Sequence, residues 1–163
     1  MALNAAPDAR APQAAQVVAE HFDAPGLLKE VLGRNARRKI KKADRKLLAR
    51  FLTHRATTRL TDWIGTLPAE GSVKLEPRSV ELDPSSARKV IATFDLSVGD
   101  GAHHLVEVRA RRGKKRGAPW KIWDVRCGAA GVHLTRQYKA QFRALTREGG
   151  LVGLVEKARG LTP

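Results

Sequence analysis

The histidine and cysteine side chains are the first candidates for chemistry in this 163-residue chain. Cys127 is the only cysteine, so it can form neither an intramolecular disulfide nor a cysteine-based metal cage, and we interpret it as a small buried apolar side chain. No histidine has the HxH, HExxH or HxxxH spacing that, combined with a carboxylate, would indicate zinc. The histidines are His21, His54, His103, His104 and His133.

Two aspartates, Asp95 and Asp124, fall in segments with strand-like alternation and could lie on neighbouring strands. Paired carboxylates can perform acid–base catalysis. Because 31 Lys and Arg side chains compete for them, we expect salt bridges at both positions instead. The sequence has no GxSxG, P-loop or GxGxxG motif. These residues therefore predict a protein that is not an enzyme and that uses neither a cofactor nor a metal.

Apolar residues at helical spacing predict helices at both ends of the chain. We expect residues 1–11, rich in Ala and Pro, to be a flexible segment, and residues 12–163 to form a single domain. Helices are expected over residues 12–22, after the capping residue Asp23 as far as Gly33, and over residues 44–65. The basic segment RNARRKIKKADRK is predicted to be a solvated junction between helices. Two more helices should follow the GAAG corner, separated by Gly149 and Gly150.

The middle of the chain has the period of two that is typical of strands. Strict alternation marks KVIATFDLSV, HLVEVRAR and PWKIWDVRC, joined by the turn-forming segments VGDGAHH and RRGKKRGAP. The upstream segment GSVKLEPRSVELD predicts one or two shorter edge strands around Pro77. The pattern predicts an α+β fold in which an antiparallel sheet of about four strands is covered on one face by the N- and C-terminal helices.

The formal net charge of +15 favours anionic partners, which include nucleic acid, an anionic membrane and an acidic protein. Aromatic residues make up only 5% of the chain, and Phe94 and Trp123 belong to the apolar alternation rather than to a stacking platform. We therefore expect no nucleic-acid partner, although a basic nucleic-acid-binding protein stays the alternative. Membrane or partner docking is predicted at an exposed basic hairpin, formed by Arg112, Lys114, Lys115 and Arg116.

The apolar faces of the predicted sheet and helices allow two interpretations. Their side chains can fill the space between sheet and helices completely, as in an NTF2-like or cystatin-like scaffold or enzyme. Alternatively, part of that space stays open and holds an apolar guest. The residues alone do not decide between the two.

The C-terminal third of the chain resembles the MlaC family, also called the toluene-tolerance or Ttg2 family. The resemblance is carried by WKIWDV (residues 120–125) and by GVHLTRQYKAQFRALTREGGLVGLVEKAR (residues 131–159). Upstream, HFDAPGLLKEVLGR and DRKLLARFLTHRATTRLTDW occupy the places of two further family segments. His133 stands where the family has a serine.

The resemblance implies a periplasmic carrier that binds phospholipid, or a related membrane lipid, as cargo and performs no chemical step. Its partners would be an inner-membrane ABC transporter with an MCE-type complex and an outer-membrane lipoprotein complex. The first residues lack the basic and apolar regions of a secretory signal, so the signal peptide would have been removed or omitted. The residues expected to line the lipid pocket are Leu27, Val31, Phe51, Leu52, Ala92, Phe94, Leu96, Val106, Val108, Trp123, Val125, Leu134, Tyr138 and Phe142.

Overall fold

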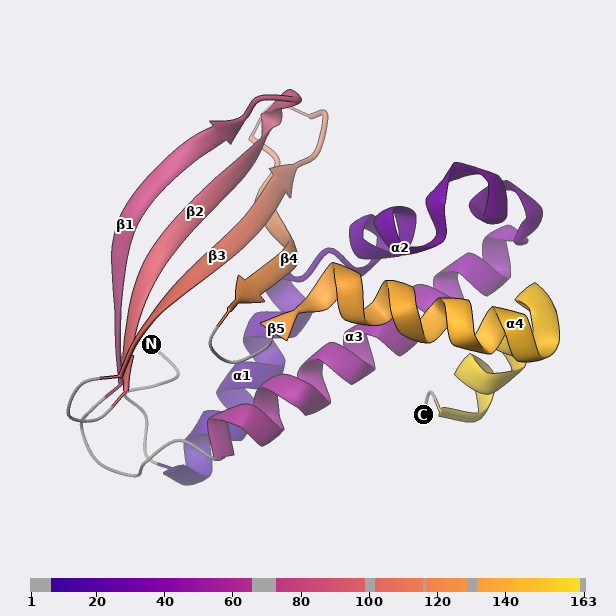
Figure 1. The fold of residues 1–163 in the computed structure, drawn as a ribbon, viewed down its shortest axis with the longest axis horizontal. Helices are drawn as coiled ribbons and strands as arrows, with labels where there is room; N and C mark the ends of the chain where they lie inside the picture. The colour runs from indigo at the N-terminus through magenta and orange to yellow at the C-terminus, as the bar shows by residue number, and fades with distance from the viewer. Residues whose placement is uncertain (1–6, 66–72, 99–101, 116, 129–131, 162–163) are drawn as a thin grey trace.

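A computed structural model describes residues 7–65, 73–98, 102–115, 117–128 and 132–161 (Figure 1). Three helices precede the sheet and a long helix follows it. The elements are α1 (Pro7–His21), α2 (Ala24–Lys39), α3 (Lys42–Gly65), β1 (Val73–Asp83), β2 (Ser86–Val98), β3 (Ala102–Arg112), β4 (Trp120–Cys127), β5 (Val132–His133) and α4 (Leu134–Leu161). The α+β class expected from the sequence is confirmed.

The sheet is an antiparallel meander in which the strands keep their chain order, β1-β2-β3-β4-β5. The segment around Pro77, expected to form one or two short strands, forms the single strand β1, with a register irregularity between Pro77 and Ser79. The fifth strand, β5, was not predicted because it has only two residues, too few for an alternation to be recognised. The sheet therefore has one strand more than expected.

The N-terminal helices extend beyond their expected bounds. Helix α1 begins at Pro7 and has Pro12 inside it, so residues 7–11 are helical. Asp23 caps α2, since its carboxylate accepts a hydrogen bond from the Gly26 amide at 2.9 Å. Gly33 breaks the helix at φ 71° and ψ 174°, as its position after an apolar stripe predicted. The helix resumes beyond Gly33, so the basic segment predicted to be a junction is helical as far as Lys39.

Helix α4 contains the two C-terminal helices expected from the sequence. They meet at Gly150, whose φ of 65° is the left-handed conformation that glycine adopts at low cost. Among the described helices, none has an apolar stretch long enough to cross a membrane.

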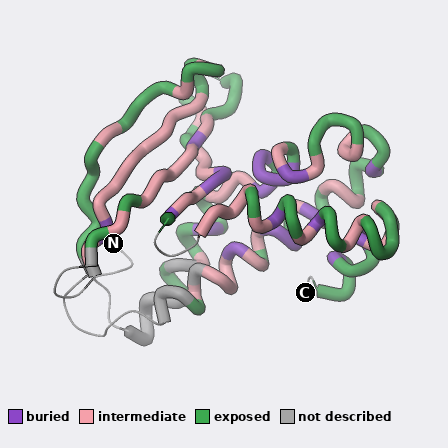
Figure 2. The backbone as a smooth tube through the Cα atoms, in the orientation of Figure 1, coloured by how far each residue is buried: buried purple, intermediate pink, exposed green. Residues whose placement is uncertain are grey.

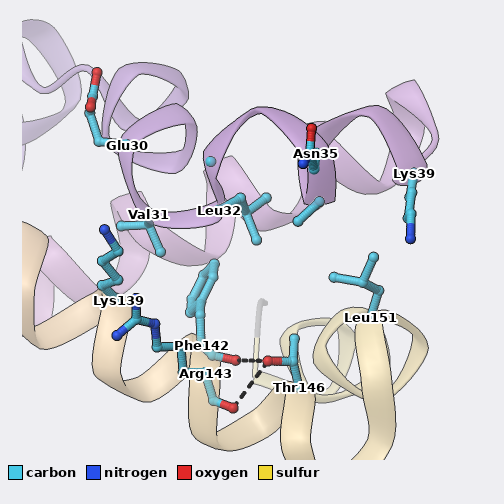
Figure 3. A pocket seen from close by; sticks show the side chains of 12 residues that line it. Glu30, Val31, Leu32, Asn35, Lys39, Lys139, Phe142, Arg143, Thr146 and Leu151 are labelled. Atoms are coloured by element: carbon cyan, nitrogen blue, oxygen red, sulfur yellow. Dashed lines mark hydrogen bonds between the residues drawn. The ribbon is translucent and has the colours of Figure 1, made fainter.

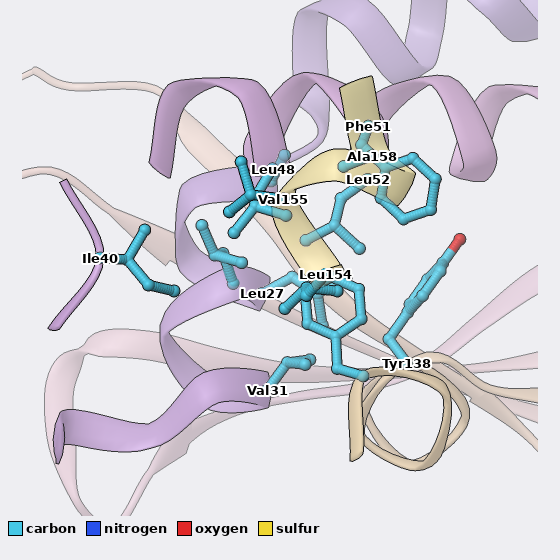
Figure 4. Close-up of a cluster of buried hydrophobic side chains, with 13 residues drawn as sticks. Leu27, Val31, Ile40, Leu48, Phe51, Leu52, Tyr138, Leu154, Val155 and Ala158 are labelled. Atoms are coloured by element: carbon cyan, nitrogen blue, oxygen red, sulfur yellow. The ribbon is translucent and has the colours of Figure 1, made fainter. Parts of the chain in front are cut away.

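The packed core lies among α2, α3 and α4 (Figure 4). Figure 2 shows that buried residues concentrate in these helices, whereas most of β1, β2 and β3 is half-buried or exposed. The core residues are Ala24, Leu27, Leu28, Val31, Ile40, Leu48, Phe51, Leu52, Tyr138, Phe142, Leu154, Val155 and Ala158. None of them belongs to a strand, so the helices bury their apolar stripes against one another.

Candidate functional site

One face of the sheet is apolar across four strands, because the strand register aligns the alternating residues. Phe94 pairs with Val106, which pairs in turn with Cys127. The next row joins Ala92, Val108 and Val125. Directly opposed residues of an antiparallel pair project from the same side of the sheet, so these rows form one continuous surface. We call this surface the apolar sheet face; it also includes Leu96, Val90, Ala110 and Ile122.

Strand β1 extends the apolar sheet face, and none of its residues was predicted to line a lipid site. Leu75 pairs with Leu96, Val80 with Ala92, and Leu82 with Val90. In the sequence, the alternation of β1 changes phase at Pro77, since Leu75 and Pro77 are odd-numbered whereas Val80 and Leu82 are even-numbered. The register irregularity between Pro77 and Ser79 absorbs the extra residue and returns both halves to the same face. That phase change was the available signal.

The apolar sheet face is partly buried on β2, β3 and β4 and most exposed on β1. Cys127 is buried, and Ala92, Phe94, Val106 and Val108 are half-buried. At the β1 edge, Leu75 is 47% exposed, Val80 68% and Leu82 64%. Single exposed apolar side chains are ordinary, but a contiguous apolar surface indicates a binding site. A large part of this surface is therefore available to an apolar partner.

Two polar contacts connect the helices with strands β3 and β4. Arg111 forms an ion pair with Asp23 at the start of α2. At the start of α4, the Thr135 amide donates to the Asp124 carboxylate at 3.0 Å. Arg111 pairs with Lys89, and Asp124 with Arg109, so both side chains project from the opposite, polar face. Among the described residues, the most extensive helix–sheet contacts are made by β4 and β5.

The aspartates considered for catalysis form ion pairs, as expected, but they do not lie on neighbouring strands. Asp95 is on β2 and Asp124 on β4, with β3 between them. Arg78 lies 3.5 Å from Asp95, whereas Arg126 lies 3.2 Å and His133 3.7 Å from the fully buried Asp124. Asp124 therefore holds the start of α4. In the described part of the chain, no cluster of three or more His, Cys, Asp or Glu side chains could hold a metal ion.

The residues predicted to line a lipid pocket fall into two groups. Ala92, Phe94, Leu96, Val106, Val108 and Val125 lie together on the apolar sheet face. Leu27, Val31, Phe51, Leu52 and Tyr138 lie in the helical core (Figure 4), to which Phe142 also belongs. Leu134 packs against this core. The two groups do not form one common cluster, because the helical side chains pack against one another and their cluster includes no strand residue. The roles of both groups stay predictions.

Trp123 stands apart from both groups. A bulge in the pairing of β3 with β4 leaves it without a partner in the register, between Ile122 and Asp124. The ring is buried, and the ammonium group of Lys89 lies 5.7 Å from its centre. Lys89 projects from the polar face, so its cation–π contact places the Trp123 ring near the polar face of the sheet.

Tyr138 is a second special case, because its hydroxyl is buried without a hydrogen-bond partner in the described structure. Burial raises the pKa of Tyr138 above its ordinary value of 10.0, and the cations of Arg59 and Arg55 oppose that increase. The Arg59 guanidinium lies 5.8 Å from the centre of the ring. Tyr138 is therefore held in its neutral form.

The basic hairpin expected to dock lies between β3 and β4. Arg112, Lys114 and Lys115 are exposed, and the Arg112 guanidinium lies 5.3 Å from the Trp120 ring centre. Arg116, the fourth predicted docking residue, lies outside the described residues. The hairpin thus presents at least three cations to solvent.

Comparisons with known proteins agree with this architecture. No curated protein matches the sequence. Among solved structures, a phospholipid-binding protein from Ralstonia solanacearum, in complex with a phospholipid, shares the fold with a TM-score of 0.64. The two sequences are 16% identical, and the match covers 93% of this chain and 82% of the other. The family model described as MlaC protein matches residues 1–159. The chain therefore belongs to the MlaC family.

Proposed function

We propose that this protein is a periplasmic lipid carrier that holds a phospholipid, or a related membrane lipid, by its acyl chains against the apolar sheet face. It moves the lipid between an inner-membrane ABC transporter with its MCE-type complex and an outer-membrane lipoprotein complex, without a chemical step. The observation that carries the proposal is the incomplete burial of an apolar surface that is continuous from β1 to β4.

Acyl chains suit this surface energetically. Burying one methylene group contributes about 0.8 kcal/mol, so a dozen methylenes contribute on the order of 10 kcal/mol before the costs of ordering the lipid. The lipid would also cover Val80 and Leu82, which are otherwise exposed to water. Dispersion and hydrophobic contacts of this kind need no catalytic group.

Two further facts support the proposal. Family membership connects the chain with lipid transport, and the Ralstonia solanacearum protein of the same fold holds a phospholipid. The net charge of +15 favours anionic headgroups and anionic membrane surfaces. The acyl chains and the headgroup would thus be recognised by different parts of the protein.

The direct test is organic extraction of the purified protein followed by mass spectrometry of the extract. We expect a phospholipid or a related membrane lipid at close to one molecule per protein. Ala92→Trp and Val106→Trp, which fill the apolar sheet face, should remove most of it without changing the circular dichroism spectrum. Thr93→Trp is the matched control, because Thr93 follows Ala92 but projects from the polar face, where it pairs with Glu107. Lipid retained equally in all three variants would contradict the proposal.

A further inference from the structure

A groove of about 400 Å³ lies between the second half of α2 and the middle of α4 (Figure 3). Its floor is apolar: Val31 and Phe142 belong to the helical core, while Leu32 and Leu151 pack against that core and stay half-buried. A helix kink lies at each side of the groove. Gly33 is part of its α2 wall, and Gly150 directly precedes Leu151 on α4. The groove is therefore an apolar strip between two helices.

The rim of this α2–α4 groove is cationic. Lys139 and Arg143 stand on the α4 side and Lys39 on the α2 side, and all three are exposed (Figure 3). None of them forms an ion pair with a described residue, and the single carboxylate that lines the groove belongs to Glu30. A partner with negative charges on both sides of an apolar stripe would satisfy the rim and the floor together.

The α2–α4 groove lies far from the apolar sheet face. In Figure 1 the strands β1, β2 and β3 occupy one end of the molecule, and the kinked parts of α2 and α4 occupy the other. A partner bound in the groove would leave the apolar sheet face uncovered. The carrier could then be held by one end while lipid enters or leaves at the other.

We propose that the α2–α4 groove docks an amphipathic helix of a partner protein, with acidic side chains flanking its apolar stripe. The inference rests on the proposed carrier function, since a carrier must be held by the complexes that it serves. Amphipathic helices bind hydrophobic grooves through apolar anchors at positions i, i+3 or i+4, and i+7. The apolar anchors of the partner helix would contact Leu32, Phe142 and Leu151. Its acidic side chains would form ion pairs with Lys39, Lys139 and Arg143.

The test uses a fluorescein-labelled helical peptide of about 18 residues, long enough to be helical when bound, with leucines at this spacing and glutamates beside them. A second peptide carries lysine in place of glutamate. Fluorescence anisotropy with the full chain should show saturable binding of the acidic peptide, and at least about tenfold weaker binding of the basic one. No saturable binding of the acidic peptide, or equal binding of both peptides, would overturn the proposal.

Variants locate the binding. The double variant Lys139→Glu with Arg143→Glu should lower the affinity for the acidic peptide by about tenfold, because two exposed rim charges change sign. The matched control is Lys114→Glu with Lys115→Glu, which makes the same charge change on the β3–β4 hairpin and should leave most of the affinity. Equal losses in the two double variants would show attraction to net charge only, and would overturn the groove as the site.

The lipid content of the same variants separates this proposal from the carrier function. We expect the double variant Lys139→Glu with Arg143→Glu to yield as much lipid on extraction as the unsubstituted protein, while its affinity for the acidic peptide falls. Ala92→Trp should yield little lipid and bind the acidic peptide normally. If the unsubstituted protein binds the peptide but yields no lipid on extraction, the carrier function is refuted and the groove is kept. If it yields lipid but does not bind the peptide, the groove alone is refuted.

Discussion

Asp124 on β4 accepts a hydrogen bond from the Thr135 amide at 3.0 Å, so a strand residue eleven positions upstream caps helix α4. A side chain that accepts from the first turn of a helix stabilises it by about 0.5–2 kcal/mol. We predict that Asp124→Ala lowers the free energy of unfolding by at least about 2 kcal/mol, since it also leaves Arg126 without this partner. Urea denaturation measures the change.

Asp124→Asn should be milder, because an asparagine oxygen can still accept from the Thr135 amide. Asp95→Asn is the control, since the ion pair of Asp95 with Arg78 is exposed at 3.5 Å and contributes little. Equal destabilisation by Asp124→Ala and Asp95→Asn would show that the cap has no energetic importance.

The exposed β1 residues should matter for lipid rather than for folding. Val80 is 68% exposed and Leu82 64%, so Val80→Asn with Leu82→Asn should change the unfolding free energy by less than about 1 kcal/mol. If acyl chains cover both side chains, the same variant should lose about 1 kcal/mol of lipid affinity per residue. Titration with a fluorescent phospholipid measures the affinity.

Leu105→Asn is the matched control for β1. Leu105 is 52% exposed, and it pairs with Asp95 on the polar face. The substitution removes one exposed apolar side chain, as each of the two β1 substitutions does, but from the side that carries no proposed lipid. Lipid affinity that falls as much per replaced residue in Leu105→Asn as in the β1 variant would argue against the apolar sheet face.

Tyr138 should make stability depend on alkaline pH. Its folded pKa is raised above 10.0 by burial, so the stability that its neutral form contributes is complete below pH 10 and is lost as the pH rises through the folded pKa. Because Tyr138 is the only tyrosine, tyrosinate absorbance reports its titration directly. We expect a midpoint above 10 in the folded protein and near 10 in urea.

Tyr138→Phe tests the same group through stability. The variant removes a buried hydroxyl without a hydrogen-bond partner, so at neutral pH it should be neutral or stabilising by about 1 kcal/mol. Above pH 10 it should lose less stability than the natural protein. A folded-state midpoint at or below 10 would contradict the assignment.

The basic hairpin should promote binding to anionic membranes. Lys114→Ala with Lys115→Ala should weaken binding to vesicles containing phosphatidylglycerol by about 1 kcal/mol per lysine. Both the binding and the effect of the variant should decrease as salt rises, because exposed charges are screened. Vesicles of phosphatidylcholine alone are the control, and vesicle sedimentation is the measurement. Binding that is unaffected by salt would contradict the electrostatic explanation.

The sequence predicted the elements better than their mutual packing. In β2 and β3 an uninterrupted alternation identified the strands, and Gly33 and Gly150 ended helical segments where the apolar stripes end. The strand around Pro77 was only partly predicted, because its alternation changes phase at the irregular register. A change of phase looks like the end of a strand until the neighbouring strand shows how the extra residue is accommodated.

Which apolar surfaces meet was not predictable. Periodicity identifies the apolar side of Phe51, Tyr138 or Val106, but it does not tell which other element will cover that side. The structure pairs the helical stripes with one another and leaves much of the apolar sheet face uncovered. For the same reason Asp124 resembled an ordinary strand aspartate, since its burial depends on where α4 begins.

The helical core of α2, α3 and α4 includes no strand residue. The side chains that stabilise this core are therefore separate from the surface proposed to bind the cargo. Sequence change can therefore widen, narrow or reshape the strands to suit a different lipid while the bundle continues to secure folding. If the apolar sheet face holds the cargo, as proposed, a change in lipid preference need not disturb the residues that stabilise the fold.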